Sequence, residues 1–384
     1  MKWEKVKLGD IATCIQPGPF GSQLHNSDYS KEGTPIIMPK DIVGGAIVHS
    51  GLLKVSEEHV KRLSRHQVYE GNLMVARKGD VRKCAYITAN ENGWMTGSDC
   101  LKVVLDESKC YPKFIYYQLR SEHIGRWLEK ISIGATMPSL NTGLLSGIEM
   151  VLPPIEIQKH IAGILSVYDD LIENNQKQIK LLEEAAQRLY KEWFVDLRFP
   201  GHENTKIVDG VPEEWRKFPL EEIAPVVTGK KDANYGDKGG NYPFFTCSQE
   251  TITAPGYSFD TSAVILAGNG DFNVKLYRGK FEAYQRTYVL APFDHSNLFN
   301  LYFTVQDNME ALAKGASGST IKFLTKGMLQ KILVLTADKK ILDKFNDYEE
   351  NIQQKVEALK KQVEDLTEIR NRLLPKLMSG EVEV

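Results

Sequence analysis

The chain has 384 residues, 42% of them hydrophobic and 26% charged, with a formal net charge of −2 at pH 7. These values are those of a soluble globular protein long enough for two domains and connecting elements. The balanced charge excludes a global argument for nucleic-acid binding, so any such argument must rest on local charge.

Cysteine usage and the N-terminal sequence bear on the compartment. The five cysteines are scattered without a Cys-x-x-Cys pair, and no histidine cluster has the spacing of zinc ligands. The first residues lack the basic-then-apolar pattern of a signal peptide, and no apolar run approaches the ~20 residues that cross a bilayer. We therefore expect a cytoplasmic protein that is neither secreted nor membrane-spanning.

Residues 1–155 are predicted to form a first, mostly-β domain. Short apolar segments such as Thr34–Met38 alternate with turn residues, and a helix is expected over 111–120. Between Lys61 and Lys83 there are seven basic side chains and two acidic ones. Basic, amide and hydroxyl side chains in loops suit contacts with phosphates and base edges, although each alone is typical of a solvated loop. The predicted DNA-binding residues here are Ser22, Gln23, Lys40, Lys61, Arg62, Arg77, Lys78, Arg82 and Lys83.

A long helix is predicted over 156–199, followed by a linker over 200–214. Apolar side chains recur at alternating steps of four and three from Ile161 to Trp193, which indicates a coiled-coil seam. A core-facing helix gives a similar stripe over three turns, but this spacing persists for about four heptads. The residues expected to pack in the seam are Ile161, Leu165, Tyr168, Ile172, Leu182 and Trp193.

The chain then begins a second time. The pattern Trp3-x-x-x-x-Leu8-x-x-Ile11 returns as Trp215-x-x-x-x-Leu220-x-x-Ile223 with identical spacing, which indicates an internal duplication. We expect a second mostly-β domain over 215–337, with a helix near 296–303. Its predicted DNA-binding residues are Lys230, Lys231, Ser248, Gln249, Lys275 and Arg278.

A second long helix is predicted over 338–378. Its seam repeats the steps of the first, and the residues expected to pack there are Ile341, Phe345, Tyr348, Ile352, Leu366 and Leu373. The polar exceptions Asn175 and Lys355 fall at the same step of the two seams, which favours either a register-setting pair or a solvent-facing kink. A helix of ~35 residues spans about 50 Å, and the second can return antiparallel to the first.

The predicted fold class is therefore α+β. Two mostly-β domains are separated by a long antiparallel two-helix coiled coil, with internal pseudo-two-fold symmetry.

Several sequences superficially suggest catalysis. Asn241–Phe244 lacks the central Pro-Pro of amino-methylating enzymes, and Ala267–Asp271 is a glycine-rich turn without a surrounding βαβ series. Asp99, Glu107 and Lys109 are ordinary charged surface residues rather than a nuclease cluster. Because the sequence also lacks a Walker-type phosphate loop, we expect no enzyme activity and no catalytic, cofactor-binding or metal-binding residue.

Motifs at the helix boundaries resemble those of the specificity subunits of type I restriction-modification systems. The matching stretches are Gly18–Gln23, Leu152–Ala162, Arg188–Gly201, Gly318–Leu329 and Leu373–Val382. The resemblance covers essentially the whole chain. The second half departs from it by having Thr336-Ala-Asp338 in place of the Pro-Pro and Gln of the first, and by lacking the Gly-Pro-Phe-Gly-Ser opening.

The resemblance implies a function and partners. Each domain would read one half of a split target in double-stranded DNA, and the helices would set the gap and dock two modification subunits. Those subunits would bind S-adenosylmethionine, and restriction subunits would use ATP and Mg²⁺, so this chain would bind no cofactor itself. The main rival is a structural scaffold with incidental basic loops; a self-contained methyltransferase or nuclease comes third.

Overall fold

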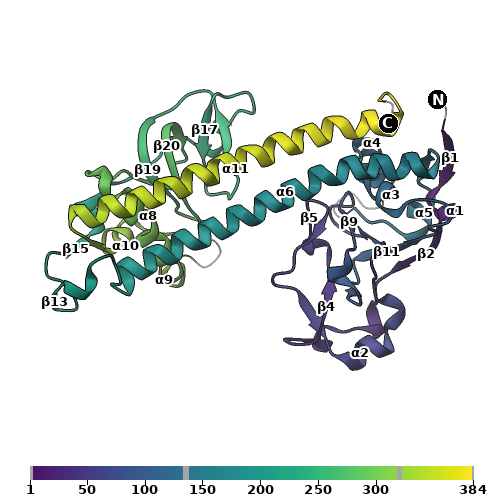
Figure 1. The fold of residues 1–384 in the computed structure, drawn as a ribbon, viewed down its shortest axis with the longest axis horizontal. Helices are drawn as coiled ribbons and strands as arrows, with labels where there is room; N and C mark the ends of the chain where they lie inside the picture. Colours follow the sequence, from purple (N-terminus) through teal and green to yellow (C-terminus); the bar gives the residue numbers. More distant parts are fainter. Residues whose placement is uncertain (1–2, 133–137, 317, 319–321, 383–384) are drawn as a thin grey trace. The chain divides into compact units, whose positions relative to one another are not determined.

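A computed structural model of the protein describes residues 3–132, 138–316, 318 and 322–382 (Figure 1). Contacts between residues divide the chain into a first unit, Met1–Asn175 with Gln362–Val384, and a second unit, Gln176–Lys361. Each unit therefore contains one predicted domain and a stretch of both long helices, α6 (Ile155–Tyr190) and α11 (Lys339–Ser379).

The first unit is built on short strands. The antiparallel sheet β2-β11-β8-β9 lies beside a second sheet of order β10-β4-β7-β3, and β1 pairs antiparallel with β12. These strands are β1 (Glu4–Lys7), β2 (Ala12–Pro17), β3 (Tyr29–Ser30), β4 (Thr34–Ile37), β7 (Leu53–Val55), β8 (Leu73–Ala76), β9 (Cys84–Tyr86), β10 (Met95–Thr96), β11 (Cys100–Leu105) and β12 (Glu149–Leu152). A small hairpin joins β5 (Ile42–Val43) to β6 (Ala46–Ile47).

Short helices complete the cores of the two sheets, with Glu57–Arg62 beside the second sheet and the others beside the first. They are α1 (Leu8–Ile11), α2 (Glu57–Arg62), α3 (Pro112–Leu119), α4 (Glu122–Ile131) and α5 (Thr142–Ser146). All side chains of α3 except Lys113 are buried, because α3 lies in a core that also contains Leu73 of β8, Ile161 of α6 and Leu377 of α11. The predicted helix over 111–120 is thus confirmed.

The second unit repeats most of these strand pairings, but in one six-stranded sheet instead of two four-stranded ones. Its sheet has the order β16-β21-β19-β20-β17-β18, and β15 pairs antiparallel with β22 as β1 does with β12. The strands are β15 (Arg216–Pro219), β16 (Val226–Thr228), β17 (Tyr242–Phe245), β18 (Ile252–Ala254), β19 (Phe259–Ala267), β20 (Val274–Ala283), β21 (Thr287–Leu290) and β22 (Leu333–Thr336). The helices are α7 (Leu220–Ile223), α8 (Leu298–Asp307), α9 (Met309–Gly315) and α10 (Lys326–Gln330). The expected α+β fold class and duplication are confirmed.

Helix α6 begins where the sequence predicts. Gln158, buried in its first turn, accepts a hydrogen bond from the Tyr111 backbone N–H (2.9 Å) and donates one to the Pro153 carbonyl (2.8 Å). These bonds satisfy backbone groups beside the helix start, where the chain would otherwise leave them unpaired. Among the predicted seam residues of α6, Ile161, Leu165, Ile172 and Trp193 are buried, and Tyr168 and Leu182 are half-buried.

The burial of the predicted seam residues of α11 differs from the expectation at Tyr348. Ile341 and Phe345 are buried and Ile352, Leu366 and Leu373 are half-buried, but Tyr348 is 56% exposed. Glu349 is the fully buried residue beside it, and Val356 and Leu359 continue the buried stripe. Tyr348 nevertheless contacts the first helix, because its ring meets the Trp193 ring edge-on with the centroids 6.0 Å apart, so it lies at the exposed edge of the seam. Two stripes with steps of four and three share every second residue, so the sequence pattern fits both.

The sequence left open whether Asn175 forms a register-setting pair with Lys355 or marks a solvent-facing kink; in the structure Asn175 is buried and has another partner. The Asn175 side-chain amide donates to Gln362 Oε1 at 3.1 Å. Because α6 and α11 run antiparallel, equal steps from their N-terminal ends do not lie at the same level. Within the first unit, Asp169 of α6 accordingly meets Arg370 of α11.

The predicted linker over 200–214 forms, together with residues 196–199, a compact turn. A π-helical turn, Lys191–Val195, ends the first helix, and the hairpin β13 (Ile207–Val208) and β14 (Val211–Pro212) closes through Asp209 and Gly210, both at positive φ. Phe194, Phe199 and Trp215 stack together in a buried aromatic cluster with Phe345. The repeated Trp215 therefore fixes the start of the second repeat.

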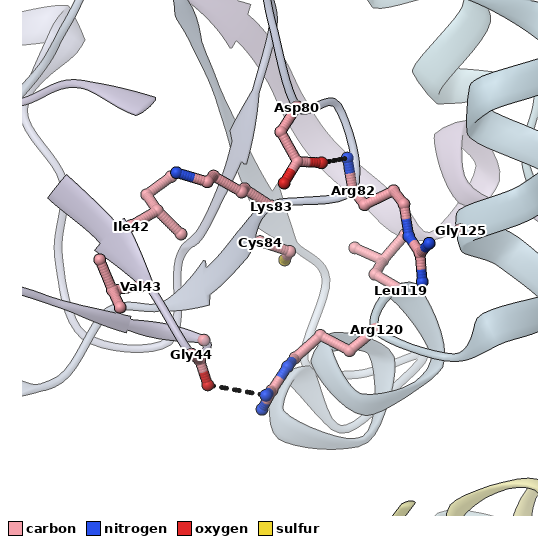
Figure 2. A pocket seen from close by; sticks show the side chains of 11 residues that line it. Ile42, Val43, Gly44, Asp80, Arg82, Lys83, Cys84, Leu119, Arg120 and Gly125 are labelled. Carbon is pink, nitrogen blue, oxygen red and sulfur yellow. Dashed lines mark hydrogen bonds between the residues drawn. The ribbon is translucent and has the colours of Figure 1, made fainter. Parts of the chain in front are cut away.

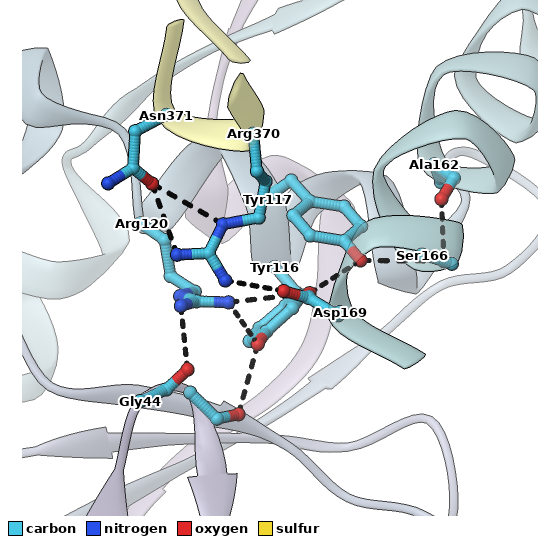
Figure 3. A network of polar contacts seen from close by, with 10 residues as sticks. Gly44, Tyr116, Tyr117, Arg120, Ala162, Ser166, Asp169, Arg370 and Asn371 are labelled. Atoms are coloured by element: carbon cyan, nitrogen blue, oxygen red, sulfur yellow. Dashed lines mark hydrogen bonds and ion pairs between the residues drawn. The ribbon is translucent and has the colours of Figure 1, made fainter. Parts of the chain in front are cut away.

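A polar network joins α3, α6 and α11 within the first unit (Figure 3). Asp169 accepts hydrogen bonds from Tyr117 (2.8 Å) and Arg370 (2.5 Å), and Arg120 Nη1 lies 3.6 Å from its carboxylate. Arg120 also donates to the Gly44 carbonyl (2.7 Å) in the β5–β6 turn. One carboxylate thus neutralises two largely buried guanidinium groups.

Candidate nucleic-acid interface

Three loops meet at one end of the sheet in the first unit. A hydrogen bond from the Gly18 N–H to the Cys100 carbonyl (3.1 Å) holds the segment after β2. A hydrogen bond from the Arg77 N–H to the Asp99 carbonyl (2.7 Å) holds the loop after β8. The loop after β4 is held by Lys83 Nζ, which donates to the Pro39 carbonyl (3.2 Å). A Cβ at Gly18 would lie 2.0 Å from the Gly97 carbonyl oxygen, so only glycine fits this approach.

Cations surround this loop cluster. The Arg77 guanidinium lies over the exposed ring of Phe20 at 5.4 Å, and Lys78 forms an ion pair with Asp99 at 2.9 Å. Arg62 of α2 donates to the Gln23 carbonyl (2.8 Å), which ties the end of α2 to the segment that carries Ser22. Lys40 lies 3.3 Å from Asp41, and Lys61 is exposed on α2.

The second unit builds the same cluster from equivalent residues. The Gly229 N–H donates to Thr287 (3.1 Å) as Gly18 does to Cys100, and Gly268 donates to Arg286 (2.9 Å) as Arg77 does to Asp99. A Cβ at Gly229 would lie 1.9 Å from the Ala283 carbonyl oxygen. Gly229–Lys231 therefore occupies the place of the Gly-Pro-Phe opening that the second half lacks in sequence.

The third loop contact is also repeated, with a different side chain. The Asn273 amide donates to the Cys247 carbonyl at 3.2 Å, in the place where Lys83 donates to Pro39. Ser248 and Gln249 are exposed in the loop after β17, as Lys40 is in the loop after β4. The structure thus brings the predicted segments of each half together.

Some predicted DNA-binding cations are engaged within the chain. Arg82 pairs with Glu122 (2.6 Å) and Glu129 (3.5 Å) of α4, and Arg278 forms two hydrogen bonds with Glu350 of α11. Lys275 donates to the Ser248 carbonyl (2.9 Å), and burial lowers its pKa. Lys83 and Lys275 therefore hold loops in place, whereas Lys230 is exposed and Lys231 lies 4.3 Å from the Tyr235 ring centroid.

Two exposed residues adjoin the second cluster without having been predicted from the sequence. Gln285 and Arg286 lie in the turn before β21, and the Gln285 N–H donates to the Lys231 carbonyl at 2.9 Å. Arg286 takes the place of Asp99 in the first repeat. Aligning the two halves through Gly18 and Gly229 would have found both residues.

A cavity of about 390 Å³ lies beside the first cluster (Figure 2). It lies between the β5–β6 turn, residues 80–84 and the start of α4, and Arg82, Lys83 and Arg120 line it. Because these cations already contact Glu122, Pro39 and Gly44, we do not include the cavity in the interface.

Metal ligands do not gather anywhere in the described ranges. Within residues 3–132, 138–316, 318 and 322–382, His, Cys, Asp and Glu side chains form no group of three or more that could hold a metal ion. In the same ranges, every helix is too short or too polar to cross a membrane. The motif Gly318–Leu329 lies partly outside the described residues.

Comparison with known proteins identifies the family. The model of the type I restriction modification DNA specificity domain matches residues 1–184 and 212–365, so the family domain is found twice and covers most of the chain. The chain belongs to this family. The match follows the duplication seen in the fold.

Individual proteins that resemble this chain are named as specificity subunits of the same family. The EcoDI specificity subunit of Escherichia coli is 37% identical over 176 residues, which are 45% of this chain and 39% of that protein. The MjaIX specificity subunit of Methanocaldococcus jannaschii is 25% identical across 100% of this chain and 94% of its own length. The crystal structure of a type I S subunit from M. genitalium has a similar fold, with a TM-score of 0.62 and 17% identity over 98% of this chain and 96% of that one.

Proposed function

We propose that this chain is the non-catalytic DNA-reading subunit of a type I restriction-modification complex, and that each repeat reads one half of a bipartite target. One observation carries the proposal: two backbone contacts and one side-chain contact at equivalent positions assemble the same three-loop cluster in both repeats of a chain in which the family domain occurs twice. Loops held in this way can present cations to phosphates and amides to base edges. Such a subunit would act on host DNA in the cytoplasm.

The two long helices would set the gap between half-sites. Helix α6 has 36 residues and α11 has 41. At 1.5 Å per residue, the shorter one spans about 54 Å, which is between one and two turns of B-DNA. Half-sites separated by an unread gap fit this length.

The helices would also dock two modification subunits. Val167, Leu171 and Leu181 of α6 are 58%, 43% and 64% exposed, although they are large apolar side chains. Apolar side chains exposed along one helix are typical of surfaces that a partner covers. In this proposal the modification subunits bind S-adenosylmethionine and methylate adenine, and restriction subunits use ATP and Mg²⁺, so this chain needs no cofactor of its own.

Filter binding tests the proposal against a structural scaffold. The chain assembled with its modification subunits should retain a duplex containing the target more tightly than random duplexes, at the same salt concentration. Sequencing of methylated sites in the host supplies that target. Equal retention of all duplexes, or none, would favour the scaffold.

A further inference from the structure

Gln249 is an exposed side chain of the loop cluster in the second unit, and a neighbouring carboxylate fixes the orientation of its amide. It is exposed in the loop after β17, and its Nε2 donates a hydrogen bond to Asp271 Oδ2 at 2.9 Å. An ionised carboxylate only accepts hydrogen bonds, so this contact fixes which end of the amide is the nitrogen. Gln249 then has its oxygen and one N–H left to offer to a ligand.

The loop that carries Asp271 is itself held in place. The Asn273 amide donates both to the Cys247 carbonyl (3.2 Å) and to the Asp271 carbonyl (2.9 Å), so one side chain joins the two loops. The Gly270 N–H donates to Lys322 (3.3 Å), and Gly270 has a positive φ of 70°. The side-chain orientation of Gln249 is therefore fixed by a turn that these hydrogen bonds hold in place.

Among the four bases, adenine offers a donor and an acceptor side by side in the major groove, at N6 and N7. Guanine offers two acceptors, cytosine a donor, and thymine an acceptor and a methyl group. On the basis of the function proposed above, we propose that Gln249 reads an adenine in the half-site of the second repeat, and that Asp271 is the positioning residue that fixes its amide.

The first repeat does not carry this pair, which provides an internal control. The turn glycine Gly79 donates to Pro138 as Gly270 does to Lys322, so Asp80 matches Asp271. Counting from Pro39 and Cys247, Asp41 matches Gln249. Asp41 is only 4% exposed and accepts from the Met38 N–H (2.9 Å), so it cannot reach a base. The adenine reading should therefore affect one half-site alone.

The test uses the full chain assembled with its modification subunits and measures binding to duplexes in which each base pair of the target is replaced in turn. Gln249→Ala should reduce the preference for adenine at one position of one half-site by about 5- to 150-fold, the range of a bidentate amide–adenine contact. Asp271→Asn should weaken the same preference, because an amide can face Gln249 in either orientation. The double variant Gln249→Glu with Asp271→Asn should favour cytosine there, since a carboxylate accepts from cytosine N4.

Asp80→Asn in the first repeat is the matched control and should leave that position unchanged. An unaltered preference in Gln249→Ala, or a change in both half-sites, would overturn the inference. A wild-type complex without any sequence preference would instead overturn the proposed function, so the two failures are distinguishable. An unchanged first half-site in each variant shows that the chain remains folded and assembled.

Discussion

The carboxyl group of Glu349 is fully buried in the seam of α11, and neither of its oxygens has a hydrogen-bond partner among the described residues. Burial raises the pKa of this carboxyl from 4.5 to about 8, and the group shares its surroundings with Tyr302, whose pKa burial also raises. A buried charge without a partner is costly, so Glu349 takes up a proton instead.

This pKa gives a pH dependence with a definite sign. A carboxyl whose folded-state pKa is raised binds its proton more tightly in the folded chain, so stability falls as pH rises from about 4.5 to about 8. Glu349→Gln removes the titration and should flatten that fall in thermal unfolding measured between pH 5 and pH 9. Asp347→Asn, on the exposed side of the same helix, is the control. Equal pH slopes for wild type and Glu349→Gln would contradict the assignment.

The cations of the first cluster differ in the partners that they already have within the chain. On the loop after β8, Arg77 lies over the Phe20 ring and Lys78 pairs with one carboxylate, that of Asp99, whereas Arg82 pairs with two carboxylates of α4. Replacing Arg77 and Lys78 together with Ala should weaken binding to all duplexes and lower the salt slope by about two, one for each phosphate that is no longer neutralised. Arg82→Ala should leave the slope nearly unchanged. The measurement is affinity against salt concentration, and equal slopes for the double variant and wild type would remove both residues from the interface.

For single residues, the sequence predicted which loops carry basic side chains better than it predicted what each of those side chains contacts. Grouped basic residues indicated the loops that meet in each cluster, but Lys83, Lys275 and Arg278 face carbonyls and carboxylates of the chain itself. Such pairings join residues up to 72 positions apart, so they depend on the fold and leave no local pattern. DNA contact by the remaining residues stays a prediction.

The helices were the most predictable elements. Alternating steps of four and three recur along both helices, and this periodicity predicted α6 and α11. Their antiparallel direction was inferred separately, from a first helix long enough for the second to return along it. The same periodicity does not decide between two overlapping stripes, which is why the sequence did not indicate that Glu349, next to Tyr348, is the fully buried residue. The partner of Asn175 depends on helix direction and level, so the step that Asn175 and Lys355 share could not identify Gln362.

The hydrogen bonds and ion pairs of Asp169 are expected to hold the C-terminal part of α11 within the first unit. Asp169→Asn would leave Arg120 and Arg370, whose side chains are 16% and 13% exposed, without their shared negative charge. We expect a loss of about 3 kcal/mol in the free energy of unfolding, as for a largely buried ion pair that loses one partner. Urea unfolding measures it, with Asp170→Asn as the exposed neighbouring control. A loss no greater than that of the control would show that the network contributes little.

Across the whole chain, duplication explains both the fold and the function. Trp3 and Trp215 mark the two starts, and equivalent strands, helices and loop contacts follow each of them. The repeat was visible in sequence because it rests on spacing between apolar residues. The equivalence of Gly229–Lys231 to Gly18–Phe20 was not, since the two segments share only the glycine that the close backbone approach requires.

The proposed function requires two readers joined by helices that set the gap in a split target. Inserting four residues, about one helical turn or 6 Å, after Asn175 in α6 and before Gln362 in α11 tests this requirement, with methylated adenines mapped across the genome of cells that carry the complex. We predict the same two half-sites as in wild type, with the gap longer by one or two base pairs. A contiguous target, or two half-sites with an unchanged gap, would contradict it.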